Sequence, residues 1–185
     1  MPQPSTPPEA APSADAEIAR RMAAGDRAAL EEAYRRHRDR VFSTAYRLMA
    51  DAGSAADLTH DAFVRAFERA AQYRGEAALG TWISRIALNL GLRQLRRERW
   101  LLRFAAERAW RAVPAEPAPA AAIDLDRALL RLPAALRTAL VLVTLEGYPH
   151  AEAAAALGIS EAACRQRVHR ARAALAAELR PEEEE

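Results

Sequence analysis

Lysine is absent from this 185-residue chain, and arginine supplies all 27 of its basic residues. Because 25 acidic residues oppose them, the formal net charge is only +2. The arginines are unevenly placed, and the segment 93–111 carries seven of them with only two glutamates. A local basic patch of this kind indicates nucleic-acid binding better than the net charge does.

Cysteine is scarce, and long apolar runs are missing. The single Cys164 excludes a disulfide framework within the chain and is typical of a reducing compartment. No apolar run approaches the ~20 residues that cross a bilayer. The N-terminus also lacks the cationic and then apolar segments of a secretory signal. These absences predict a cytoplasmic protein without direct membrane insertion.

Residue patterns that carry catalytic chemistry are missing too. The sequence contains no Gly-rich phosphate loop and no nucleophile constellation. Its four histidines show no metal-ligand spacing with Cys164. Asp57 and Asp61 lie one helical turn apart, but without a second pair they are more typical of a surface or partner contact. The sequence therefore predicts neither an enzyme nor a bound metal or cofactor.

Proline-rich and charged segments divide the chain. Residues 1–14 contain five prolines and little that could pack, which predicts a disordered tail. Residues 112–123 are rich in Pro and Ala and predict a linker that could span roughly 30 Å when extended, while residues 181–185 form an acidic tail. The segments between them, 15–111 and 124–180, have helical periodicity. The sequence thus predicts an all-α fold of two small helical domains joined by a Pro/Ala-rich linker.

Capping and turn residues place the expected helices. In the first domain, they cover residues 15–24, 26–50, 54 to about 71 and, after a loop at 72–80, a basic helix to about 110. Ser54 and Asp57 resemble a capping box for the third of these. In the second domain, the helices cover residues 124–131, 133–146, 149–157 and 160–179. Pro133 suits a first helical position, and Ser160 suits a cap after a tight turn at Gly158, so the last two helices form a helix-turn-helix.

The basic helix and the loop before it are the most informative stretch, from residue 73 to residue 99. On an ideal helix, with ~100° per residue, residues at spacings of three and four share one face. This face carries Trp82, Arg85, Asn89, Arg93 and Arg96. The adjoining face, with Ile83, Ile86, Ala87 and Leu90, can dock onto a core. We predict a helix that is held by its apolar side and offers arginine to a polyanion; Trp82 fits a core anchor as well as a DNA contact.

The last expected helix carries a second set of arginines. Its buried stripe is predicted to consist of Cys164, Val168, Ala171, Leu175 and Leu179. The first turns carry Arg165, Gln166 and Arg167, and the N-terminal part of a recognition helix is the part that reaches base edges in the major groove. Arg170 and Arg172 lie farther along and suit phosphate contacts.

Four segments, in order, resemble a bacterial sigma factor of the extracytoplasmic function (ECF) class. SAADLTHDAFVRAF (54–67) is similar to the polymerase-binding helix, and YRGEAALGTWISRIALNLGLRQLRR (73–97) to the promoter-melting loop and minus-ten helix. LPAALRTALVLVTLEGYPHAEAAAALGIS (132–160) resembles the start of the minus-thirty-five domain, and EAACRQRVHRARAAL (161–175) its recognition helix. The chain departs from the family pattern at His60, where Gln is usual, at Arg93, and at the loop tip 78–80.

This resemblance implies a sigma factor that binds core RNA polymerase and directs promoter recognition, DNA melting and initiation for a specialised regulon. Its partners would be core RNA polymerase and promoter DNA, with an anti-sigma protein as a candidate third. Polymerase binding would fall on Asp57, Leu58, Asp61 and Phe63. Minus-ten recognition and melting would fall on Tyr73, Arg74, Trp82, Arg85, Asn89, Arg93, Arg96 and Arg97. Minus-thirty-five recognition would fall on Arg165, Gln166, Arg167, Arg170 and Arg172.

Two other interpretations remain at this point. A helix-turn-helix regulator that acts without polymerase would explain the last helix but leave the segment 54–67 unexplained. A helical interaction protein, such as one sequestered by an inhibitor, would make the arginine faces incidental.

Overall fold

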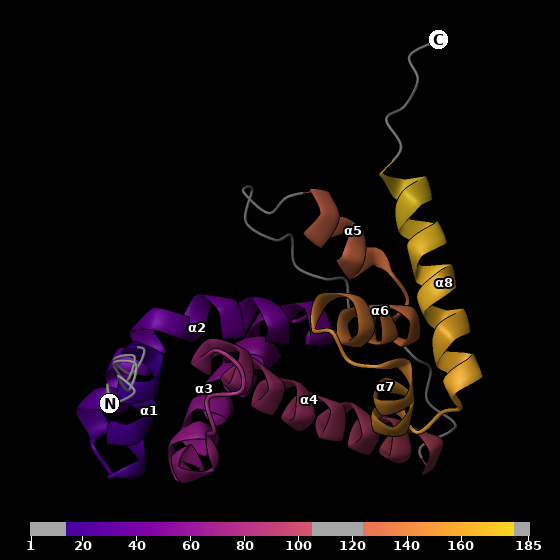
Figure 1. Ribbon diagram of the computed structural model, residues 1–185. Coiled ribbons are helices and arrows are strands. Elements are labelled where there is room, and N and C mark those ends of the chain that lie inside the picture. Colours follow the sequence, from indigo (N-terminus) through magenta and orange to yellow (C-terminus); the bar gives the residue numbers. More distant parts are fainter. Residues whose placement is uncertain (1–13, 105–123, 180–185) are drawn as a thin grey trace, which may run out of the picture.

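The computed structural model describes residues 14–104 and 124–179, and within those ranges it is helical without a strand (Figure 1). The first domain contains α1 (Ala14–Ala23), α2 (Arg27–Met49), α3 (Ala52–Glu68), the short 3-10 helix η1 (Ala70–Gln72) and α4 (Leu79–Phe104). The second contains α5 (Asp124–Arg131), α6 (Ala134–Leu140), the π-helical turn η2 (Val141–Leu145), α7 (His150–Leu157) and α8 (Glu161–Glu178). The all-α prediction is confirmed. The expected end of the basic helix near residue 110, the linker and the two tails lie outside the described residues.

The start of α3 differs from the prediction. The capping residue is Asp51, whose Oδ2 accepts the N–H of Ser54 at 2.9 Å, so the prediction that Ser54 caps this helix was wrong. The turn after α2 is shorter than expected because Ala50 takes a left-handed conformation with φ 58° and reverses the chain within two residues. The hydrogen bond that the Ser54 N–H donates to Asp51 lowers the pKa of the Asp51 carboxyl, because the charged carboxylate is the better acceptor.

The core of the first domain lies between α2, α3 and α4. Leu48, Ile83 and Leu88 are fully buried there. A Cβ atom on Gly91 would lie 2.5 Å from Cδ2 of Leu48 and 2.8 Å from Cδ2 of Leu58. Glycine therefore allows α4 to approach both neighbouring helices more closely than any other residue would.

The second domain packs α5, α6 and α8 around a smaller core that includes Leu129, Leu140 and Val168. Arg137 is buried in it, and its Nη1 donates to the carbonyl oxygens of Leu130 (3.2 Å) and Leu132 (3.0 Å) at the end of α5. Burial lowers the pKa of this guanidinium, since the charged group has left water. The two carbonyl oxygens satisfy Nη1, whereas the buried Nε has no hydrogen-bond partner among the described residues.

The helix expected at 133–146 is divided. Pro133 lies one residue before α6 as its cap, and α6 ends at Leu140, where the chain widens into the π-helical turn η2. Gly147, with φ 72°, then ends the segment, as its sequence position predicted. By contrast, the prediction of a Ser160 cap is confirmed, because its hydroxyl accepts the N–H of Ala163 at 3.2 Å.

The two domains touch each other. Arg47 of α2 donates two hydrogen bonds to the carboxylate of Asp126 in α5, at 2.7 and 3.2 Å. The buried hydroxyl of Thr44, one turn earlier, donates to Oε1 of Glu146 at 3.0 Å. Val141, Leu142, Ala153, Ala154 and Cys164 join the buried cluster of the first domain. Figure 1 accordingly shows α6 beside one end of α2, with α5 next to α6.

Candidate functional site

An aromatic pair lies at the loop that leads into α4. The hydroxyl of Tyr73 donates to the carbonyl oxygen of Ala77 at 2.7 Å, which ties the two ends of the loop together. The Tyr73 ring lies 5.5 Å from that of Trp82, tilted by 58°. Both rings are half-buried against the core of the first domain. Trp82 is thus an anchor of α4 that also keeps part of its surface exposed beside the loop.

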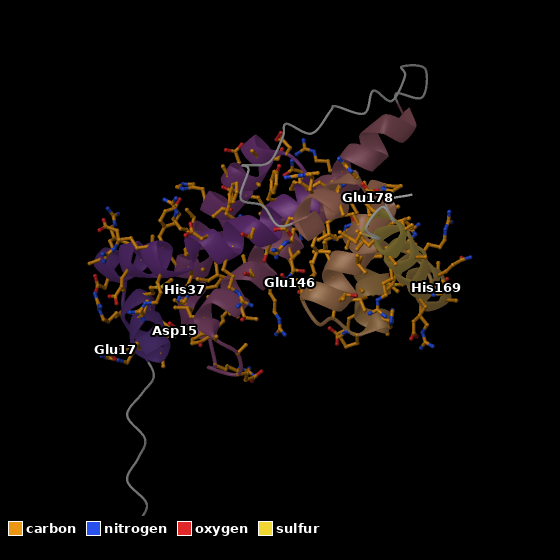
Figure 2. The ribbon with its side chains drawn as sticks, turned by 90° about the horizontal axis from the view of Figure 1, so that it is seen from above. Asp15, Glu17, His37, Glu146, His169 and Glu178 are labelled. Carbon is orange, nitrogen blue, oxygen red and sulfur yellow. The ribbon has the colours of Figure 1, made fainter. Side chains whose placement is uncertain are left out.

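Asp15 of α1 reaches the first residue of α4. Its Oδ2 accepts the N–H of Leu79 at 3.1 Å, and its Oδ1 accepts a hydrogen bond from Nε2 of His37 at 3.2 Å. Figure 2 shows Asp15 and His37 close together on α1 and α2. Burial, and secondarily the negative charge of Asp15, raises the pKa of the nearby Tyr73 hydroxyl. Sequence reasoning missed Asp15, since no local motif links residues 64 positions apart.

The predicted basic face of α4 lies on the surface. Its exposed residues are Arg85, Asn89, Arg93, Arg96 and Arg97, and Arg74 is exposed in the loop. The opposite side is the core side, with Ile83, Ala87 and Leu88 buried. Arg85 also lies near Tyr148 of the second domain, where its charge counteracts the effect of burial, which raises the pKa of the Tyr148 hydroxyl. The face is therefore a one-sided cationic surface that begins at the loop and runs along the helix.

The arginines of α8 surround a narrow buried stripe. Cys164, Val168, Ala171 and Leu175 are buried as predicted, whereas Leu179 is 43% exposed and was wrongly assigned to the stripe, because α8 ends before it. The exposed residues of the predicted set are Arg165, Gln166, Arg170 and Arg172, and Arg167 is half-buried. His169, which lies between them, points outward at the free side of α8 (Figure 2).

Neighbours hold two of these arginines without removing them from solvent. Arg165 pairs with Glu161 one turn before it, and Arg172 donates to Oγ1 of Thr144 at 3.2 Å.

Burial raises the pKa of the Cys164 thiol, which disfavours the reactive thiolate and agrees with a packing role for this residue.

The residues predicted on α3 divide into two groups. Asp57 and Asp61 are exposed, while Leu58 and Phe63 are 4% and 2% exposed and serve the core. The ring of Phe63 also packs edge-on against the ring of Tyr34 in α2, with the ring centroids 4.9 Å apart. Val64 is 40% exposed on the same outer side of α3, so a mixed acidic and apolar surface faces solvent there.

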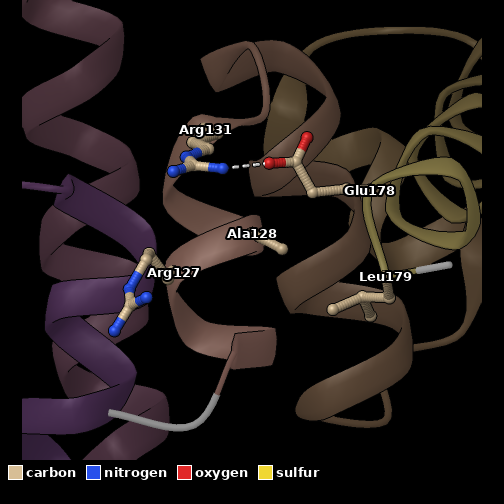
Figure 3. A pocket seen from close by; sticks show the side chains of 5 residues that line it. All are labelled: Arg127, Ala128, Arg131, Glu178 and Leu179. Carbon is tan, nitrogen blue, oxygen red and sulfur yellow. Dashed lines mark hydrogen bonds and ion pairs between the residues drawn. The ribbon is translucent and has the colours of Figure 1, made fainter. Parts of the chain in front are cut away.

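A hollow between α5 and the end of α8 has a different character. It is lined by Arg127, Ala128, Arg131, Glu178 and Leu179, and the ion pair between Arg131 and Glu178 crosses it (Figure 3). None of the residues predicted to contact DNA or polymerase lines this hollow.

Across the described ranges, no group of three or more His, Cys, Asp or Glu side chains is placed to hold a metal ion. No described helix has the length and apolarity to cross a membrane.

Family comparisons match both domains in order. Residues 33–101 match Sigma-70 region 2, and residues 122–175 match Sigma-70, region 4. The ECF RNA polymerase sigma factor SigM of Mycobacterium tuberculosis is 35% identical over 162 residues, covering 88% of this chain and 83% of that protein. SigE of Mycolicibacterium smegmatis, another ECF RNA polymerase sigma factor, is 37% identical over 161 residues, covering 81% of this chain and 62% of that protein.

Solved structures show the same fold. The sigma factor RpoE from Bartonella quintana, in complex with the anti-sigma factor NepR, aligns with a TM-score of 0.58 at 23% identity, covering 82% of this chain and 97% of that one. CnrH, in complex with the cytosolic domain of CnrY, aligns with a TM-score of 0.50 at 27% identity, covering 89% and 96%. The two regions match in order, and the identity to SigM extends over most of both chains. The chain therefore belongs to the ECF class of RNA polymerase sigma factors.

Proposed function

We propose that this sigma factor binds core RNA polymerase through the outer face of α3 and opens promoter DNA at the loop before α4. The observation that carries the proposal is the cationic face of α4, which begins at a loop that Tyr73 closes and beside which Tyr73 and Trp82 form an aromatic pair. Sigma factors are not enzymes, and we extend this to the present chain, together with a cytoplasmic location.

DNA opening without nucleotide hydrolysis requires the capture of a base that has left the stack. Extruding a base costs a few kcal/mol, and stacking on an aromatic side chain returns ~1–3 kcal/mol per base. Tyr73 and Trp82 supply such aromatic surface beside the loop. Arg85, Asn89 and Arg93 continue from it along one exposed face, where they can hold the phosphates of the separated strand.

The minus-thirty-five element is assigned to α8. Arg165 and Gln166 lie exposed in its first two turns, where forked donors and acceptors reach purine edges. Arg170 and Arg172 lie farther along and fit phosphates. On α3, Asp57 and Asp61 would meet polymerase directly, and the buried Leu58 and Phe63 would position the helix. An anti-sigma partner is proposed because RpoE, which shares this fold, was solved in complex with the anti-sigma factor NepR.

Run-off transcription with purified core polymerase tests the proposal. We expect promoter-dependent initiation with the wild-type chain, and we expect Asp57→Arg with Asp61→Arg to abolish it by weakening polymerase binding. The control is Asp39→Arg, a charge reversal at an exposed carboxylate of α2 that pairs with Arg38. Salt-sensitive binding of free DNA, with no co-migration with core polymerase, would instead support a regulator that acts alone.

A further inference from the structure

The first turn of α4 receives its cap from a distant helix. The first N–H groups of a helix have no partner within it, and the residue before Leu79 is Ala78, whose side chain cannot accept a hydrogen bond. Asp15 fills this role across 64 residues of sequence, with its Oδ2 at 3.1 Å from the Leu79 nitrogen. The carboxylate also lies at the positive end of the helix dipole.

His37 completes the support. Its Nε2 is bonded to Asp15, and a Cβ atom on Gly80 would lie 2.8 Å from its Nδ1 and 3.2 Å from its Cγ. The imidazole ring is therefore wedged between the Asp15 carboxylate and the backbone of the first turn of α4. Arg36 adds a positive charge, 3.7 Å from the same carboxylate oxygen. These contacts set both the position and the direction of the start of α4.

The same carboxylate lies beside the loop. The hydroxyl of Tyr73, which donates to the carbonyl oxygen of Ala77, is near enough to Asp15 for the negative charge of Asp15 to contribute to its raised pKa. Helix α1 is itself fixed by the buried side chains of Ile18 and Met22. A rigid chain of contacts thus runs from the core through α1 to the loop and the first turn of α4.

We propose that Asp15, together with His37, is a positioning residue for promoter melting. It holds the loop 73–78 and Trp82 in the geometry that receives the unstacked base, so that the ordering cost is met before DNA arrives. The inference rests on the proposed function, and it assigns to α1 a role in DNA opening although α1 carries none of the predicted DNA contacts.

The test compares three variants of the full chain with core polymerase. Asp15→Ala removes the cap, Asp15→Asn keeps an acceptor oxygen but not the charge, and Glu17→Ala changes a neighbouring carboxylate of α1 that pairs with Arg20 on the surface. Three quantities are measured: affinity for core polymerase, fluorescence of a base analogue in the minus-ten element, and transcription from a template with a pre-opened, mismatched minus-ten segment. Thermal unfolding of each variant is recorded alongside.

We expect Asp15→Ala to slow opening of duplex DNA by roughly fivefold, the change that corresponds to the loss of a typical helix cap. Affinity for polymerase and transcription from the pre-opened template should stay close to wild type. Asp15→Asn should recover most of the opening rate, and Glu17→Ala should match wild type. Equal losses on both templates, or an unchanged opening rate for Asp15→Ala, would overturn the inference.

Hydrogen exchange separates this inference from the proposed function. In the free protein, the amide of Leu79 should exchange faster in Asp15→Ala than in Asp15→Asn or Glu17→Ala, because only the first loses its acceptor. Unchanged exchange would refute the cap itself, whatever the result of transcription. If exchange rises but the wild-type chain fails to initiate at any promoter, the proposed function fails while the cap stands.

Discussion

The two arginine-bearing helices, α4 and α8, are held in the fold in different ways. α4 packs against two helices at once, with Gly91 at the closest approach, and its first turn is capped by Asp15. α8 is capped locally by Ser160 and rests on a narrow stripe of small and medium side chains such as Cys164 and Ala171. α4 therefore offers one rigid face, whereas α8 exposes most of its circumference. A fixed face suits capture of a base beside a loop, and a protruding helix suits entry into a groove.

The largest effect is expected where α4 is most tightly held. Gly91→Val would place side-chain atoms within the space of Leu48 and Leu58, both buried, and we expect a loss of about 2–3 kcal/mol in the free energy of unfolding, as for other overpacked cores. Ala173→Val on the exposed side of α8 is the matched control and should cost less than about 1 kcal/mol, mainly through helix propensity. Urea unfolding measures both. Equal costs would mean that α4 is no more tightly packed than α8.

A second difference concerns the DNA that each helix meets. Gln166→Ala should weaken binding of duplex DNA carrying the matched minus-thirty-five element by about 1–3 kcal/mol and relax the preference at one base pair. Asn89→Ala should leave that duplex binding unchanged and reduce binding to single-stranded minus-ten DNA. Fluorescence anisotropy of the holoenzyme with each probe measures the two effects. If both variants lost the same affinity for the duplex, α8 and α4 would not bind separate DNA elements.

Sequence alone predicted what depends on neighbouring residues. The Ser160 cap, the α8 stripe from Cys164 to Leu175, and the exposed arginine face of α4 all follow from helical spacing and local capping, and the structure agrees. The Asp51 cap was missed because a left-handed Ala50 shortened the turn, which no residue preference signals. The contact of Asp15 with Leu79, and those between the domains, join residues far apart in sequence, so no pattern could reveal them. The roles assigned to individual site residues stay predictions.

Two buried hydroxyl groups of the first domain differ in their hydrogen bonding. Ser84 of α4 is fully buried, and its Oγ has no hydrogen-bond partner among the residues that the structure describes. Thr59 of α3 is similarly buried but donates to the carbonyl oxygen of Ala55 at 2.7 Å. Because an unsatisfied buried group carries a desolvation penalty, Ser84→Ala should raise the free energy of unfolding by about 1 kcal/mol. Thr59→Val, which keeps the shape and loses the hydrogen bond, should lower it by a similar amount. A loss in both variants would show that Ser84 has a partner in solution.

The smallest effect is expected at the contact between the two domains. The ion pair of Arg47 and Asp126 is bidentate, but the two side chains are 31% and 29% exposed. It should therefore contribute less than about 1 kcal/mol to the free energy of the contact between the domains. Reversing one charge with Asp126→Arg would place two arginines together and should shift the domains apart, with the larger shift at low salt, because ions screen the repulsion. Arg47→Asp combined with Asp126→Arg restores opposite charges and should restore the contact. Energy transfer between dyes on α1 and α8 measures the separation. If the single and double variants both keep the wild-type separation, the apolar contacts of Val141 and Leu142 with the first domain do not depend on this pair, and the two DNA-facing helices are held together by packing alone.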